Sequence, residues 1–211
     1  MTAVHASTAF LNGLFMSLVL IVAIGAQNAY VLRQGLRREH VSAVVLFCAV
    51  CDAVLVAAGV AGMAQALKGR PMLATLLAGF GAAFLCGSGL RALWRSRQPG
   101  ALQTVSQGAS RSRAAVVAQA AGFTLLNPHV YLDTVLLVGT AGAQYPGLLK
   151  AWFVVGSTLA SVLWFTALGF GARLLAPVFA RPRAWQMLDA LIGGTMLVLA
   201  ALLARRAFMG Y

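Results

Sequence analysis

The sequence has few charged residues and very few acidic ones. Only 9% of its 211 residues are charged and just four are Asp or Glu, whereas soluble domains carry about 25% charged residues. This shortage excludes an ordinary water-soluble fold and makes the position of each carboxylate informative. Asp52, Asp133 and Asp189 lie within or at the edge of long apolar stretches, while Glu39 lies in a polar connection.

Cysteine and histidine are also scarce. Three cysteines in the whole chain exclude a disulfide-stabilised secreted scaffold. The three histidines fall in separate segments, so neither a metal site nor a cofactor is predicted. Cys48 and Cys51 form a C-x-x-C pair, which is the spacing of a membrane thiol–disulfide relay. Their apolar helix disfavours the reactive thiolate, so packing is the simpler interpretation and the relay is kept as an alternative.

The chain is rich instead in long apolar runs. Hydrophobic residues make up 61% of it, and a helix needs about 20 of them in succession to cross a bilayer. The sequence predicts six such spans, at residues 10–32, 41–67, 71–94, 114–143, 148–176 and 186–204. No Lys or Arg precedes the first run, which exceeds the length of a signal peptide, so we expect it to be retained. The predicted fold class is an all-α polytopic membrane protein.

Basic residues outnumber acidic ones by 16 to 4, for a formal net charge of +12. In a soluble protein this excess would suggest nucleic acid, but membrane topology explains it better, and no nucleic-acid partner is predicted. The connections after the first, third and fifth spans hold 11 of the 16 basic residues. By the positive-inside rule, both termini then face the periplasm. A five-span protein with a cytoplasmic N-terminus is the competing interpretation.

The longest polar segment divides the chain into two halves. Residues 95–113 are rich in Ser, Gln, Gly and Arg, which predicts a flexible cytoplasmic linker. Residues 1–94 and 114–211 each contain three predicted spans. Because this number is odd, the second half enters the membrane in the opposite sense, as in inverted-repeat transporters. The sequence therefore predicts six transmembrane helices arranged as two inverted three-helix repeats.

Both halves open with a span that contains an amide-rich, weakly helical segment. Pro128 lacks an amide hydrogen and disfavours helical angles at Asn127, so a helix break is predicted there. Asn127 also suits an N-cap and Pro128 a first helical position, so a half-helix would start here with free amide groups that favour a carboxylate. Gly25 is the weak point of the first half, and Gln27 and Asn28 offer amide donors and acceptors beside it.

The carboxylates in the apolar stretches need partners, because a charge at the centre of a membrane helix costs about 2.5–3.5 kcal/mol. Asp52 has no base within reach on its own helix. Asp133 follows His129 by four residues, with Tyr131 between them. A site that accepts a carboxylate at the half-helix start and a cation at Asp133, about 8 Å further along, has the polarity of an amino acid. Asp189, near basic residues at the inner interface, is predicted to make a structural ion pair or to favour a helix N-terminus.

Three segments carry a resemblance to a known family: Gly25-Ala-Gln-Asn-Ala-Tyr-Val-Leu-Arg-Gln-Gly35, Cys51-Asp-Ala53 and Leu126-Asn-Pro-His-Val-Tyr-Leu-Asp-Thr134. Through them the chain resembles, over essentially its whole length, the lysine/arginine exporter (LysE/ArgO-type) family of bacterial inner-membrane proteins. The resemblance implies export of basic amino acids, chiefly L-arginine or L-lysine, from the cytoplasm at the expense of the proton-motive force.

The resemblance also implies a set of site residues. Substrate binding is expected from Gln27, Asn28, Asp52, Asn127, Pro128, His129, Tyr131 and Asp133. Asp52 and Asp133 are the candidates for proton coupling, and Gly25 and Pro128 for the helix breaks. The expected partners are a basic amino acid, protons and membrane lipid, and homo-oligomers are left open. Export of neutral amino acids or of a metal cation on the same scaffold is an alternative.

Overall fold

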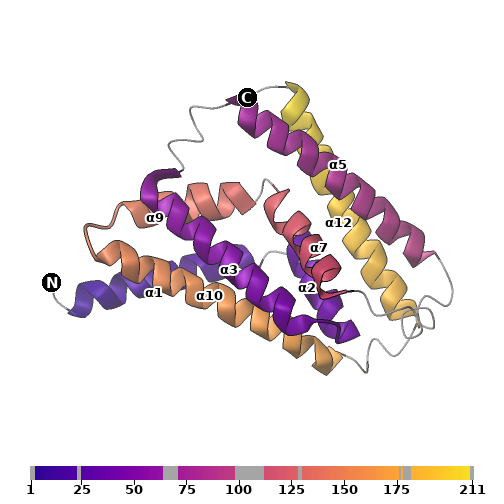
Figure 1. Ribbon diagram of the computed structural model, residues 1–211, viewed down its shortest axis with the longest axis horizontal. Coiled ribbons are helices and arrows are strands. Elements are labelled where there is room, and N and C mark those ends of the chain that lie inside the picture. The colour runs from indigo at the N-terminus through magenta and orange to yellow at the C-terminus, as the bar shows by residue number, and fades with distance from the viewer. Residues whose placement is uncertain are drawn as a thin grey trace.

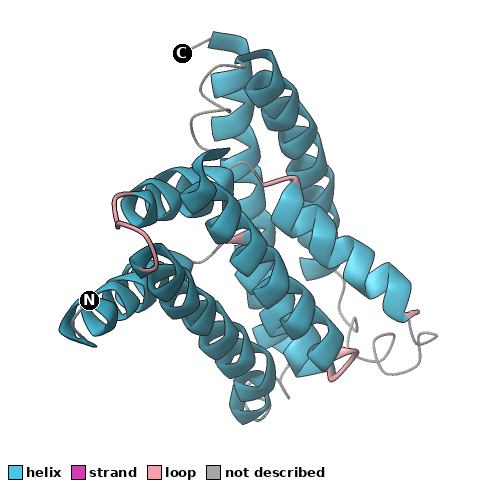
Figure 2. Ribbon diagram, turned by 60° about the vertical axis from the view of Figure 1, so that its left-hand side comes forward, coloured by secondary structure: helices cyan, strands magenta, loops and turns pink. Residues whose placement is uncertain are grey.

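The computed structural model describes residues 3–22, 25–63, 71–97, 112–127, 130–175, 177 and 182–209. All regular structure in these ranges is helical, without a strand (Figure 2). The elements are α1 Ala3–Ile21, α2 Ala26–Arg37, α3 Val41–Ala58, η1 Gly59–Met63, α5 Pro71–Ser96, α7 Arg113–Leu125, η2 Tyr131–Val138, α9 Gly139–Ala143, α10 Leu149–Gly171, η3 Ala172–Leu175 and α12 Pro182–Met209. The prediction of an all-α chain is confirmed for these residues.

Four of the described segments are long and apolar enough to cross a membrane: Val4–Ile21, Val41–Gly62, Leu149–Leu175 and Arg183–Leu202. Their outward faces carry large apolar side chains, such as Val54 on α3 and Val198 on α12, which are about 60% exposed. Apolar surface on this scale is stable against lipid tails rather than water. These features identify a helical membrane protein with several spans.

Two of the predicted spans are interrupted. α1 ends at Ile21 and α2 begins at Ala26, while α7 ends at Leu125 and η2 begins at Tyr131. In each case a side chain beyond the interruption donates a hydrogen bond to the carbonyl oxygen of the residue that ends the first half. Asn28 Nδ2 donates to Ile21 at 2.6 Å and the Tyr131 hydroxyl to Leu125 at 2.9 Å. These bonds satisfy carbonyl groups that a broken helix leaves without a partner.

The first interruption does not depend on the conformational freedom of glycine. Gly25 has φ −108° and ψ 175°, which is extended backbone open to any residue, and a Cβ on it would meet no atom within 4 Å. The weak helix propensity of Gly25 favours the break, while the Asn28 bond supplies a specific contact that stabilises it.

Two helix pairs dominate the packing (Figure 1). α5 lies along α12, and α1 lies along α10. The second pair approaches closely, because Gly13 of α1 faces the backbone of Phe153, and Gly156 of α10 faces that of Phe10. The Ser157 hydroxyl donates to the Gly13 carbonyl oxygen at 3.2 Å. Small residues and a hydrogen bond between helices are the usual means of helix association within a membrane.

We expect Gly156→Ala to destabilise the protein by about 3 kcal/mol, at the upper end of the usual cost of overpacking. The new Cβ would overlap the backbone carbonyl oxygen of Phe10, which cannot turn aside as a side chain can, so α1 and α10 must separate. Thermal unfolding in detergent would measure the loss. Gly171→Ala is the matched control, because a Cβ there meets open space. Equal unfolding temperatures for the two variants would contradict the prediction.

Candidate functional site

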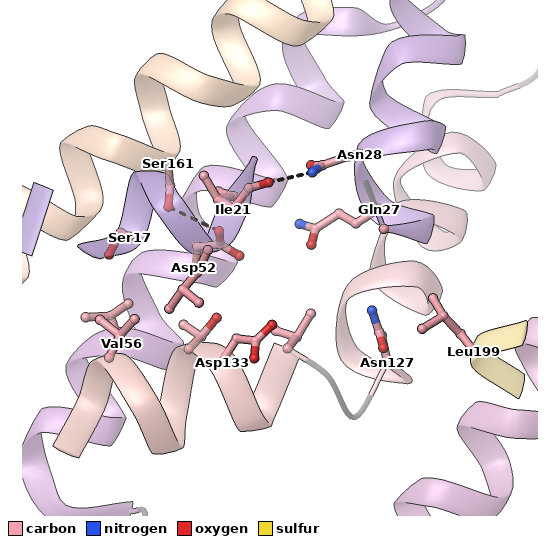
Figure 3. A pocket seen from close by; sticks show the side chains of 15 residues that line it. Ser17, Ile21, Gln27, Asn28, Asp52, Val56, Asn127, Asp133, Ser161 and Leu199 are labelled. Carbon is pink, nitrogen blue, oxygen red and sulfur yellow. Dashed lines mark hydrogen bonds between the residues drawn. The ribbon is translucent and has the colours of Figure 1, made fainter. Parts of the chain in front are cut away.

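A cavity of about 280 Å³ lies where the two interrupted segments meet (Figure 3). Its volume is close to the lower end of the range for small-molecule sites, about 300–1,000 Å³. Helices α1, α2, α3, η2, α10 and α12 contribute to its wall, together with both interruptions. The polar residues that line it are the amides Gln27, Asn28 and Asn127, the carboxylates Asp52 and Asp133, and the hydroxyls Ser17, Thr134 and Ser161.

Asp52 reaches the cavity from the middle of α3 and is 7% exposed. The Ser161 hydroxyl on α10 donates to its Oδ2 at 3.1 Å. The Gln27 amide approaches from α2 on the facing side (Figure 3). Gln27 Nε2 is buried without a hydrogen-bond partner among the described residues. One carboxylate oxygen is thus anchored, while a buried amide donor beside the cavity is left for another acceptor.

Asp133 lines the same cavity from η2, on the opposite wall from α10 (Figure 3). η2 has the wider turns of a π-helix, a local form that is frequent at functional sites. The sequence alone places Asp52 and Asp133 on different spans, and the structure brings them to one cavity. No Lys or Arg occurs among the described residues that line it. The cavity therefore favours a ligand that carries positive charge.

An asparagine lies at each interruption. Asn28 donates to Ile21, and its Oδ1 accepts a hydrogen bond at 3.2 Å from Trp164 Nε1 of α10. Asn127 is 5% exposed, and its carbonyl oxygen accepts from the amide of Val130 at 3.1 Å. The described helical structure begins again at Val130, and both Asn127 and Val130 lie against the cavity.

The structure does not place every predicted site residue at the cavity. Pro128 and His129 are outside the described residues. Tyr131 is not among the residues that line the cavity, and its hydroxyl bridges the second interruption by bonding to Leu125. The structure adds Ser17, whose buried Oγ has no hydrogen-bond partner among the described residues. A single serine in an apolar helix gives no sequence signal for such a position, because serine also packs between membrane helices.

No cysteine is among the described residues that line the cavity. Cys48 is fully buried, Cys51 is partly buried, Cys86 on α5 is exposed, and all three are free thiols. Burial closes Cys48 to an exchange partner, which must reach the sulfur atom. Within the described part of the chain, no group of three or more His, Cys, Asp or Glu could hold a metal ion.

The remaining acidic residue of the apolar stretches, Asp189, lies outside the cavity. It pairs with Arg33 of α2 at 3.3 Å and with Arg95 of α5 at 3.5 Å, and its side chain is 5% exposed. The sequence predicts either an ion pair or a helix N-terminal charge for Asp189; the structure shows ion pairs, with partners from distant segments instead of the sequence neighbours. The cluster joins α2 to the α5–α12 pair.

Helices of membrane-spanning length that enclose a polar cavity at two helix interruptions define a membrane transporter. The chain belongs to the LysE type translocator family, whose model matches residues 18–207. This confirms the family resemblance drawn from the sequence. The protein is a transporter and not an enzyme, so the thiol–disulfide relay has no support.

Several curated relatives are similar along nearly their whole length. The chain is 40% identical over 199 residues to the putative amino-acid transporter YggA of Aeromonas salmonicida, covering 94% of this chain and 97% of that protein. It is 47% identical over 184 residues to the putative amino-acid transporters Mb0498 of Mycobacterium bovis and Rv0488 of Mycobacterium tuberculosis, covering 87% of this chain and 90% of each. No solved structure matches the chain.

Proposed function

We propose that this protein exports basic amino acids, L-arginine and/or L-lysine, from the cytoplasm in exchange for protons. The observation that carries the proposal is the charge of the cavity, which holds the carboxylates Asp52 and Asp133 and no Lys or Arg among its described residues. A neutral amino acid would bring no net positive charge to these carboxylates in a poorly solvated space, where an uncompensated charge is costly. A basic amino acid brings one net positive charge. The relatives named as putative amino-acid transporters support amino acids as the substrate class.

The substrate's two ends would meet different walls. Its carboxylate would rest at the second interruption beside Asn127, near the positive end of the helix that follows, helped by the buried Gln27 amide. Its cationic end would face Asp133 or Asp52. Pro128 and His129 keep the binding roles that the family resemblance implies. Tyr131 stabilises the second helix interruption through the hydrogen bond of its hydroxyl to Leu125.

Export of a cation needs an energy source. Moving one positive charge outward against an inside-negative potential costs about 2.3 kcal/mol per 100 mV. Exchange for one proton cancels this electrical cost and leaves the pH gradient as the driving force. In this scheme Asp52 or Asp133 releases its proton to the cytoplasm before the cation binds and is reprotonated from outside after the cation leaves.

We further propose six spans, arranged as inverted repeats 1–94 and 114–211 around the cytoplasmic linker 95–113, in the bacterial inner membrane with both termini periplasmic. The interruptions fall in the first span of each proposed repeat, which supports the repeat. Basic residues also meet at one end of the bundle: Arg38, Arg113 and Arg173, from the ends of α2, α7 and α10, line one pocket. Such clustering supports a cytoplasmic position for this end.

Proteoliposomes loaded with labelled arginine or lysine test the proposed substrate and coupling together. We expect efflux to accelerate severalfold when the outside is made acidic, because protons then enter in exchange for substrate, and a protonophore to remove the effect. Unlabelled arginine and lysine inside should compete, whereas alanine and leucine should not. Efflux of neutral amino acids that is indifferent to internal arginine and lysine would refute the proposed substrate class. Efflux unaffected by the pH gradient would refute the coupling.

A further inference from the structure

A second, smaller pocket lies between α2, α5, α7 and α12 and shares no lining residue with the central cavity. Four arginines line it: Arg33, Arg37, Arg91 and Arg95. Two carboxylates pair with three of them, since Asp189 contacts Arg33 and Arg95 while Glu39 contacts Arg37. The cluster therefore keeps an excess of two positive charges. Its polarity is opposite to that of the central cavity, so it suits an anion.

The size of this pocket limits what it can hold. Its volume is about 50 Å³, whereas a single water occupies about 10–15 Å³ on the same measure. A group of a few heavy atoms fits, but a whole amino acid does not. Guanidinium groups match the oxygen atoms of phosphate well, because they can donate two parallel hydrogen bonds to it. The donors available include Arg37 and Arg95, whose buried Nε atoms have no hydrogen-bond partner among the described residues.

The surroundings of the pocket show where such a group would come from. On α5, Leu90 and Trp94 are 56% and 67% exposed and lie one position away from Arg91 and Arg95. On α12, Leu191 is 56% exposed beside Ile192, which lines the pocket. Exposed apolar side chains with a tryptophan among them are typical of the level where lipid tails meet headgroups. The helices that form the pocket therefore also carry exposed apolar surface, from which a lipid headgroup can reach the arginines.

We propose that this arginine pocket binds the phosphate group of an anionic membrane lipid. Two positive charges in excess favour a lipid whose headgroup is negative overall, such as phosphatidylglycerol, and basic pockets between membrane helices are known to accept such headgroups. A zwitterionic lipid carries the same phosphate, but its choline group would add a positive charge beside the arginines. The proposed lipid site does not depend on which substrate is transported. It can therefore be tested separately from the proposed export activity.

Native mass spectrometry of the purified full-length protein tests the proposal. Phosphatidylglycerol and phosphatidylcholine are added together and compete for binding. We expect one phosphatidylglycerol to bind in preference to phosphatidylcholine. Arg91→Gln should weaken this binding about fivefold, given roughly 1 kcal/mol for each basic residue near anionic lipid. Arg91 is exposed and no carboxylate is paired with it in the described residues, so its loss should leave the fold intact. Arg91→Lys, which keeps the charge, should retain most of the binding.

Arg205→Gln is the matched control, because Arg205 is an exposed arginine at the far end of α12. It should bind phosphatidylglycerol like the parent protein. Equal binding of the two lipids, or equal weakening by Arg91→Gln and Arg205→Gln, would overturn the proposal. A third arm uses inorganic phosphate: if millimolar phosphate binds with the same dependence on Arg91 while phosphatidylglycerol does not, the lipid source is refuted.

Discussion

Asp133→Asn and Asp52→Asn are each expected to lower the efflux of labelled arginine and lysine at least about 30-fold. Both carboxylates line the central cavity, and removing one partner of a desolvated charge pair costs about 2–5 kcal/mol, of which 2 kcal/mol already corresponds to this factor. Asparagine keeps the size of the side chain, so the loss would report on charge rather than on packing. The rates would be measured in the loaded proteoliposomes described above.

The two aspartate variants should differ in how they fail. If Asp133 binds the cation, its variant should show a raised KM for arginine. If Asp52 carries the proton, its variant should lose the response to the pH gradient while still exchanging internal for external arginine. Glu39→Gln is the matched control, since Glu39 pairs with Arg37 outside the cavity and should leave efflux near the parental rate. Parental rates in both aspartate variants would show that the cavity carboxylates are not used.

Asp189→Asn is expected to lower the free energy of unfolding by about 3 kcal/mol. The residues that line the central cavity are unchanged in this variant. The Asp189 carboxylate, 5% exposed, is the shared partner of Arg33 and Arg95, so its neutralisation leaves two guanidinium groups close together with less compensation. Breaking a buried ion pair by removing one partner costs about 3–5 kcal/mol, and we take the lower end because the Arg95 side chain is 31% exposed. Chemical unfolding in detergent micelles, followed by far-ultraviolet circular dichroism, would measure the loss.

Two further variants serve as controls for the loss of the Asp189 charge. Asp189→Glu keeps the charge and should recover part of the lost stability. Glu39→Gln breaks one ion pair instead of two, and the Glu39 side chain is 18% exposed against 5% for Asp189, so its effect should be smaller. If Asp189→Asn unfolds at the same denaturant concentration as the parent, the ion pairs of Asp189 do not contribute to the free energy of unfolding, and the prediction is wrong.

Much of the helical pattern could be predicted from the sequence. Every predicted span contains helix in the described residues, because apolar runs of this length have no other stable form in a bilayer. The interruption next to Pro128 follows from local chemistry, since proline removes a backbone donor at a known position. The interruption near Gly25 is less determined locally, because its main visible support is the side chain of Asn28, which reaches back to Ile21.

The partners of the polar groups could not be predicted in the same way. Asp52 meets Ser161 across 109 positions of sequence, and Asn28 meets Trp164 across 136. Tyr131 was predicted as a binding residue from its place in the motif, yet its hydroxyl is bonded to Leu125. Neither a motif nor a helical period specifies which way a side chain turns when several acceptors compete for it.

The sequence by itself determined that this chain is a helical membrane protein of the LysE type translocator family, because long apolar runs and local motifs are properties of neighbouring residues. Only the tertiary structure decided that Asp52 and Asp133 line one cavity while Asp189 pairs with two arginines. The basic neighbours of Asp189 set it apart in the sequence, but they named neither its actual partners, Arg33 and Arg95, nor the cavity that Asp52 and Asp133 share. The difference arises from which helices pack together, since in a low-dielectric interior a carboxylate is defined by the charges and donors that the fold brings to it.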